Sequence, residues 1–153
     1  MLKIKNGKLY GTHLSFALPE NFYLALKRDI CEGNGLQFIS EDGAVEIEIL
    51  FERGTENLRE ELLTFGEDCN FSLKGEIVPV FRGRKGMAAL FVNQAKTEKY
   101  YEERYLVPEN KNGENMICIG ISLLHWRGGK FRSLNEVLNA REVSDFLNSI
   151  HLR

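Results

Sequence analysis

The chain has 153 residues, and its 43% hydrophobic and 27% charged content is typical of a globular protein. This composition excludes a disordered chain, a collagen-like repeat and a disulfide-dense scaffold. Twenty Lys and Arg residues against twenty-two Asp and Glu residues give a net charge of −2. With no global charge excess, we expect neither nucleic-acid binding nor association with an anionic membrane.

The sequence favours a cytoplasmic protein. A basic residue stands at every second or third position of residues 3–8, where a secretion signal needs an apolar stretch of about 7 to 15 residues. The longest uncharged apolar run, residues 116–124, is shorter than the roughly 18 residues of a membrane-spanning helix, so we expect no membrane insertion. Three scattered cysteines fit reduced thiols better than a disulfide framework: Cys31, Cys69 and Cys118.

The first half of the chain reads as a series of strands separated by tight turns. Asn6-Gly7 is the first turn signal, and residues 14–18 then alternate apolar and small side chains. Residues 20–30 fit a strand and a helix equally well. Residues 45–51 alternate apolar residues with glutamates, which predicts a half-buried strand.

A helix is predicted over residues 56–65, with Thr55 as its N-cap and Gly66 as its end. The second half then returns to strands. Residues 87–92 and 116–124 carry apolar side chains at successive positions, so both faces of these strands should be covered. Residues 100–107 place aromatic and charged side chains on each face, which suits a partly exposed strand.

The C-terminal region reads as helical. Ser133 and Glu136 form a capping-box pair, in which each side chain accepts a hydrogen bond from the backbone N–H of the other residue. The apolar stripe that follows changes phase near Asn139-Ala140, which predicts a break or a bend before the last helical stretch.

No linker and no internal repeat divides the chain, so we predict a single α+β domain over residues 1–153. The frequent hairpin turns favour a single antiparallel, twisted β-sheet with helices packed on both faces, an α/β/α sandwich. Charge is unevenly placed along this domain. Residues 41–68 contain ten acidic and two basic residues, a local net charge of −8, which can orient a protein partner.

The sequence lacks the motifs of common catalytic sites. Its histidines and cysteines have no zinc-ligand spacing, and no nucleophile elbow or phosphate-binding loop occurs. We therefore predict no metal site, no cofactor and no catalytic residues. A histidine that meets a thiol in the fold, such as His125 with Cys31 or Cys69, is the alternative.

Two groups of residues are candidate binding sites. The connector before the capped helix gathers basic side chains beside helix N–H groups, which predicts an anion site at Arg127, Lys130, Arg132 and Ser133, with a solvated connector as the alternative. Tyrosine and tryptophan are frequent in protein interfaces, which predicts a partner surface at Tyr101, Tyr105 and Trp126. The alternative is that these tyrosines simply cover the sheet.

The segment Leu14-Ser15-Phe16-Ala17-Leu18-Pro19-Glu20-Asn21-Phe22 resembles the opening of the PsbP-like α/β/α sandwich superfamily. The order of the following hairpin, helix, strand meander and last helix is similar as well. This resemblance implies an antiparallel sheet with helices on both faces and mostly non-catalytic roles. Extrinsic photosystem subunits, a Ran-binding nuclear-import factor, bacterial lipoproteins and secretion-associated chaperones belong to that superfamily.

We conclude from the sequence that the chain is a small soluble non-catalytic interaction protein, adaptor-like or chaperone-like, whose partner is another protein. The alternative from another class is an anion-binding, small-ligand-binding or enzymatic domain that uses the connector of residues 127–133. Self-association as a homodimer through an exposed strand edge is a third hypothesis.

Overall fold

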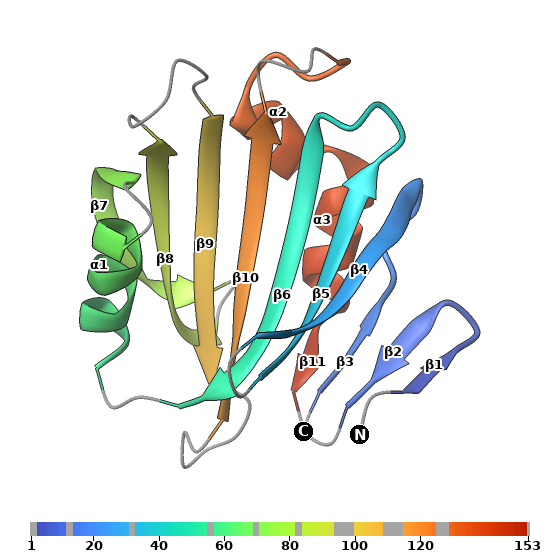
Figure 1. Cartoon of the computed structure of the whole chain (residues 1–153), viewed down its shortest axis with the longest axis horizontal. Coiled ribbons are helices and arrows are strands. Elements are labelled where there is room, and N and C mark those ends of the chain that lie inside the picture. Colours follow the sequence, from blue (N-terminus) through green and yellow to red (C-terminus); the bar gives the residue numbers. More distant parts are fainter. Residues whose placement is uncertain are drawn as a thin grey trace.

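The computed structural model describes residues 3–11, 14–30, 33–54, 57–68, 71–81, 84–93, 100–108, 115–124 and 129–152. These residues form an α+β fold with two sheets, and the pairs of neighbouring strands are antiparallel (Figure 1). The predicted single sheet is therefore wrong, whereas the α+β class and the antiparallel pairing are confirmed.

The larger sheet has seven strands in the order β4-β5-β6-β10-β9-β8-β7. Its members are β4 (Phe22–Ile30), β5 (Gly33–Ser40), β6 (Val45–Arg53), β7 (Phe71–Phe81), β8 (Arg84–Asn93), β9 (Tyr100–Pro108) and β10 (Asn115–Leu124). The smaller sheet has the order β1-β2-β3-β11, formed by β1 (Lys3–Lys5), β2 (Lys8–Tyr10), β3 (Leu14–Ala17) and β11 (His151–Leu152). The ambiguous residues 20–30 thus belong mostly to a strand.

Three helices complete the fold: α1 (Leu58–Asp68), α2 (Leu134–Asn139) and α3 (Arg141–Ser149). The cap of α1 is Asn57, whose side-chain oxygen accepts a hydrogen bond from the Glu60 N–H at 3.1 Å. Thr55, the predicted cap, lies outside the described residues. Gly66 does not end α1 as predicted, because it is a buried position within the helix.

The predicted helix start and the predicted break are confirmed, and the capping box is confirmed for one of its two hydrogen bonds. Ser133 is the N-cap of α2, and its hydroxyl accepts a hydrogen bond from the Glu136 N–H at 3.2 Å. Ala140 adopts an extended conformation between α2 and α3, which is the predicted break. The glutamate of the capping box accepts from the Arg132 N–H at 2.9 Å, one residue before the cap.

The helices cover opposite faces of the larger sheet. Ile117, Ile119 and Ile121 belong to a core cluster shared with α2, α3 and the smaller sheet. Met116 and Cys118, which alternate with them along β10, belong to a second cluster shared with α1. Figure 1 agrees with this arrangement, because α2 and α3 lie behind the sheet and α1 lies at its β7–β8 side. Residues 116–124 are all buried, as their unbroken apolar character predicted.

Candidate functional site

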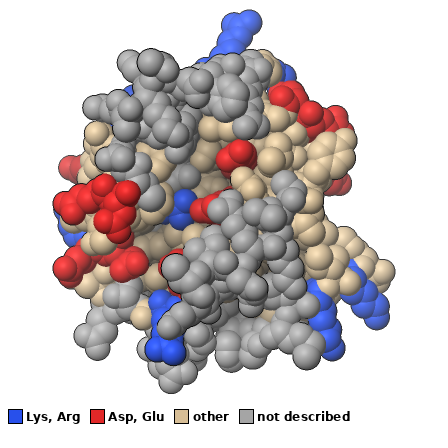
Figure 2. All heavy atoms as spheres, in the orientation of Figure 1, with Lys and Arg blue, Asp and Glu red and all other residues tan. Residues whose placement is uncertain are grey.

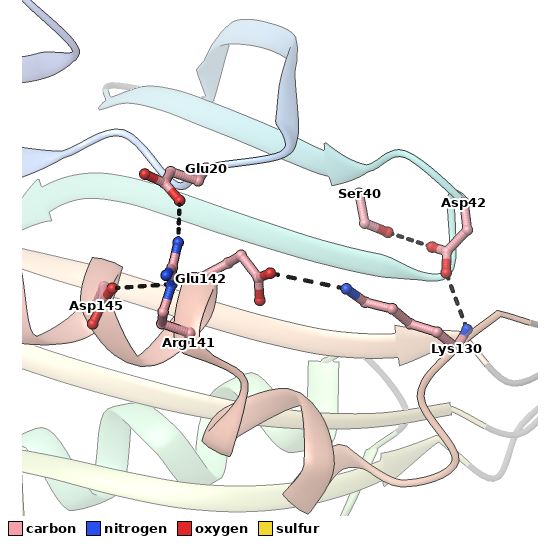
Figure 3. A network of polar contacts seen from close by, with 7 residues as sticks. All are labelled: Glu20, Ser40, Asp42, Lys130, Arg141, Glu142 and Asp145. Carbon is pink, nitrogen blue, oxygen red and sulfur yellow. Dashed lines mark hydrogen bonds and ion pairs between the residues drawn. The ribbon is translucent and has the colours of Figure 1, made fainter.

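A network of polar contacts joins four distant segments of the chain beside the start of α3 (Figure 3). The turn between β5 and β6 supplies Asp42, whose carboxylate accepts hydrogen bonds from the Ser40 hydroxyl at 2.7 Å and the Ala44 N–H at 3.0 Å. The same carboxylate accepts from the Lys130 N–H at 3.3 Å. The Ser40 hydrogen bond lowers the pKa of Asp42 against a smaller desolvation effect, and the Ala44 and Lys130 contacts lower it further. Asp42 therefore anchors the connector before α2 as an ionised group.

Gly129 allows the connector to approach this turn closely. Its φ of +144° is unfavourable for an L side chain, and a Cβ there would lie 2.6 Å from Asp42 Oδ2 and 2.9 Å from the Ala44 Cβ. The backbone of residues 129–130 is thus held against the β5–β6 turn by contacts that do not involve the Lys130 side chain.

On the other side of the connector, the Lys130 side chain reaches toward α3. Its ammonium lies 3.9 Å from a Glu142 carboxylate oxygen and 4.9 Å from the centre of the Phe131 ring. Arg141, at the first position of α3, pairs with Glu20 at 3.1 Å and with Asp145 at 4.0 Å. Figure 3 shows Arg141 pointing toward Glu20 of the β3–β4 turn, and Glu142 and Lys130 pointing toward each other.

A pocket of about 280 Å³ lies within this network. It has an apolar part formed by Phe22, Phe131 and Val143. Polar and charged side chains complete its wall: Asn21, Ser40, Glu41, Asp42, Lys130 and Glu142. A second, open depression adjoins it and shares Lys130, Phe131 and Glu142. The position where these segments meet can hold a small group with both apolar and charged contacts.

The predicted anion-site residues fall partly within this region. Lys130 borders the pocket. Arg132 and Ser133 instead take part in the N-cap of α2. The Glu136 carboxylate accepts a hydrogen bond from the Arg132 N–H, and the Glu136 N–H donates to the Ser133 hydroxyl. Arg127 lies outside the described residues. Two carboxylates, Glu136 and Glu142, lie beside these basic residues, so anion binding there stays a prediction.

The predicted partner surface contains one described side chain, that of Tyr105. This residue is only 7% exposed and packs in the core cluster on the α2 and α3 side, because β9 is an inner strand between β8 and β10. The expectation that Tyr105 is available to a partner is therefore wrong. The side chain of Tyr101 and the whole of Trp126 lie outside the described residues.

A buried charge that the sequence did not single out lies on the α1 side of the sheet. Arg104 of β9 is 3% exposed, and its guanidinium donates to Glu48 at 3.1 Å and to the Cys118 sulfur at 2.8 Å. The guanidinium also lies 3.9 Å from the centre of the Phe65 ring of α1, at cation–π distance. Small residues, Ala89 and Gly120, stand beside it on the neighbouring strands and leave room for it.

Negative charge surrounds this arginine. Glu52 lies on the same strand as Glu48, and burial together with the charges of Glu61 and Glu48 raises the pKa of Glu52, partly offset by Arg104. Figure 2 shows the corresponding face of the molecule, which is hollowed near its centre with basic and acidic side chains at the hollow. One guanidinium therefore does not neutralise the carboxylates between β6 and α1.

The solvent side of α1 continues this acidic region. We call it the acidic α1 face, and its residues are Glu60, Glu61, Leu63, Glu67 and Asp68, all exposed. Figure 2 shows acidic side chains gathered at the edge of the molecule where Figure 1 places α1. The last turn of the helix contains no basic residue, although cations are favoured there by the helix dipole.

The described residues show no metal site, since they contain no group of three or more His, Cys, Asp and Glu that could hold an ion. None of the described helices is long and apolar enough to cross a membrane. Three candidate sites stand out in the described residues: the pocket beside Lys130, the Arg104 cluster and the acidic α1 face.

Comparisons with known proteins support the fold. No protein-family model and no curated protein matches the sequence. Among solved structures, the Saccharomyces cerevisiae Ran-binding protein Mog1p is similar, with a TM-score of 0.58 and 11% identity over 98% of this chain and 96% of that one. A variant of the protein Mog1 gives the same TM-score and identity, over 99% of this chain and 96% of that one. This chain therefore has a Mog1-like fold.

Proposed function

We propose that this chain is a small non-catalytic interaction protein, adaptor-like or chaperone-like, whose acidic α1 face binds a basic surface of a protein partner. The observation that carries the proposal is the concentration of acidic residues on α1, which includes Glu67 and Asp68 in the last turn, where acids do not help the helix. Acidic side chains in the last turn of a helix are unfavourable by roughly 0.3–1 kcal/mol each. Glu67 and Asp68 thus oppose the stability of α1, as binding residues often do.

The neighbouring surface supports the same mode of binding. Leu63 is 38% exposed and lies between Glu60 and Glu67 on the helix surface, so an apolar contact is surrounded by charge. Such a layout is suited to a basic partner that also offers an apolar residue at its centre. Burying the Leu63 contact would add affinity, and the carboxylates would speed and orient the encounter.

A specific partner is suggested by the fold likeness. The similar yeast protein is described as Ran-binding, and we therefore propose Ran as the first partner to test for this chain. We further propose that the chain is a member of the PsbP-like superfamily, forms a single domain and works in the cytoplasm. The anion-binding, small-ligand-binding or enzymatic role of the 127–133 connector remains the second candidate. The pocket beside Lys130 supports the small-ligand form of this candidate, and its three carboxylates do not favour the anion form.

The double variant Glu67→Gln/Asp68→Asn tests the proposed function. Because it removes charges that oppose the helix dipole, it should leave the fold intact and raise the free energy of unfolding slightly. The same variant should bind purified Ran, or members of an array of Lys- and Arg-rich peptides, several-fold more weakly than the original chain. Binding by the original chain should also weaken as salt increases.

A matched control removes two negative charges elsewhere. Glu20→Gln/Asp145→Asn has the same net charge as the test variant, but its changes lie beside α3, on the other side of the sheet. This control should bind as the original chain does. Equal weakening of both variants, or no binding of Ran and of every basic peptide by the original chain, would refute the proposal.

A further inference from the structure

The pocket beside Lys130 has the chemistry of a cation site. Three carboxylates, those of Glu41, Asp42 and Glu142, contribute to its wall, against the single ammonium of Lys130. The adjoining depression adds Glu136 and Arg141, so negative charge remains in excess. An incoming anion would meet this excess, whereas an incoming cation would be attracted by it.

The chain's own Lys130 already occupies the position that a bound cation would take. Its ammonium lies 3.9 Å from the Glu142 carboxylate oxygen and 4.9 Å from the centre of the Phe131 ring. A carboxylate and an aromatic ring are the two groups that recognise organic cations in proteins.

Lys130 is nevertheless held loosely at this position. Its side chain is 65% exposed, and an exposed ion pair of this kind contributes only about 0.2–1 kcal/mol. The Lys130 backbone, in contrast, is fixed through its N–H to Asp42. The side chain can therefore leave the pocket without any movement of the connector, and little free energy opposes its displacement.

The size and apolar part of the pocket limit what can replace the lysine. A volume of about 280 Å³ is at the lower end for small-molecule sites, so a group the size of one side chain fits and a nucleotide does not. Phe22 and Val143 offer apolar contact to an aliphatic stem, and the carboxylate of Glu142 faces the charged end.

We propose that this pocket binds an organic cation, a guanidinium or an alkylammonium group, which displaces the Lys130 side chain and takes its place beside Glu142 and Phe131. The cation comes either from a small ligand or from an Arg or Lys side chain of a protein. This site is separate from the acidic α1 face and does not depend on the proposed function.

The test is a titration of the full chain with Nα-acetyl-arginine methylamide, followed by amide chemical shifts. Saturable changes are expected at residues 130, 131 and 142. The Lys130→Ala variant should bind the probe about two- to fivefold more tightly, because it loses the internal competitor. Glu142→Gln and Phe131→Leu should each weaken binding, since one removes the carboxylate and the other removes the ring.

Matched controls separate displacement from a general charge effect. Arg132→Ala removes one exposed positive charge two residues away, and it should tighten binding less than Lys130→Ala does. The Glu67→Gln/Asp68→Asn variant of α1 should bind the probe as the original chain does, so failure here and failure of the proposed function are distinguishable. An Arg-containing peptide that binds far more tightly than the probe would assign the site to a protein partner, and equal affinity would assign it to a small ligand.

Three outcomes would overturn the proposal. The first is the absence of saturable shifts with the arginine probe. The second is equal tightening by Lys130→Ala and Arg132→Ala, which would show that only net charge matters. The third is saturable binding of inorganic phosphate at the same residues without binding of the cation, which would return the connector to the predicted anion site.

Discussion

At the residue scale, Arg104 is the charge on which packing under α1 depends. Its partners come from three elements: Glu48 of β6, Cys118 of β10 and Phe65 of α1. Burying an ion pair costs about as much desolvation free energy as the attraction between its charges returns. Removing only one member is therefore more destabilising than keeping the pair or replacing both members. The Glu48 side chain is 24% exposed, so water lowers the free-energy cost of leaving its charge unpaired but does not remove it.

We therefore expect Arg104→Met to lower the free energy of unfolding by about 3 kcal/mol, because it leaves Glu48 beside Glu52 with no guanidinium between them and α1. Adding Glu48→Gln should restore at least half of the loss. Urea denaturation of the two variants measures both effects. Additive losses in the double variant would show that the arginine acts through packing alone.

The sequence could not reveal this arginine as a buried group. Residues 100–107 show charge and aromatic side chains on both faces, which is typical of a partly exposed strand. The strand is instead an inner one with residues 104–107 buried, because it pairs with β8 and β10 and the sequence does not show which strands pair.

By contrast, Lys130 was predicted as a site residue because its basic neighbours and the Ser133 cap are local. Its partners Asp42 and Glu142 were not, since only tertiary structure brings them together.

At the scale of elements, the sequence predicted boundaries well where the signal lies in the residues at the boundary itself. Ser133 begins α2, Ala140 separates α2 from α3, and Asn6 and Gly7 both have positive φ in the first turn, as the hairpin between β1 and β2 requires. Gly66 misled the prediction. It is glycine because α1 packs closely on β8: a Cβ there would lie 2.9 Å from Cε1 of Phe91.

Gly66→Ala should accordingly destabilise the protein even though alanine is the better helix former. Helix propensity favours alanine by about 1 kcal/mol, but overpacking a buried contact typically costs 1–3 kcal/mol. The Phe91 ring cannot easily move, since it is buried and packs against Phe65 and Phe71. We expect a net loss of about 1 kcal/mol by chemical denaturation. Thr64→Ala, at an exposed position of the same helix, should stabilise slightly, and a gain from Gly66→Ala would contradict the close packing.

At the scale of the whole molecule, the division into two sheets depends on pairing between distant segments. β11 near the C-terminus pairs with β3 near the N-terminus, and the strands β1, β2 and β3 complete this sheet apart from the large one. Alternating side chains show that a segment is a strand, but not which strand it pairs with. The core cluster under α2 and α3 contains residues of both sheets. The same apolar pattern in the sequence is therefore compatible with one sheet and with two. The prediction of a single sheet failed for this reason.

The uneven charge of the molecule makes its free energy of unfolding depend on pH, and Glu52 contributes to this dependence. Burial and the nearby Glu61 raise its pKa in the folded state above the unfolded value. The folded protein then binds this proton more tightly, so Glu52 destabilises the fold at neutral pH and ceases to do so as the pH falls below its unfolded pKa.

Glu52→Gln should raise the free energy of unfolding at pH 7, and this gain should shrink toward pH 4. Urea titrations at both pH values measure it, with Glu46→Gln on the same strand as the control for loss of one charge. A gain that is unchanged at pH 4, or matched by the control, would show that the carboxylates between β6 and α1 do not repel one another as the structure indicates.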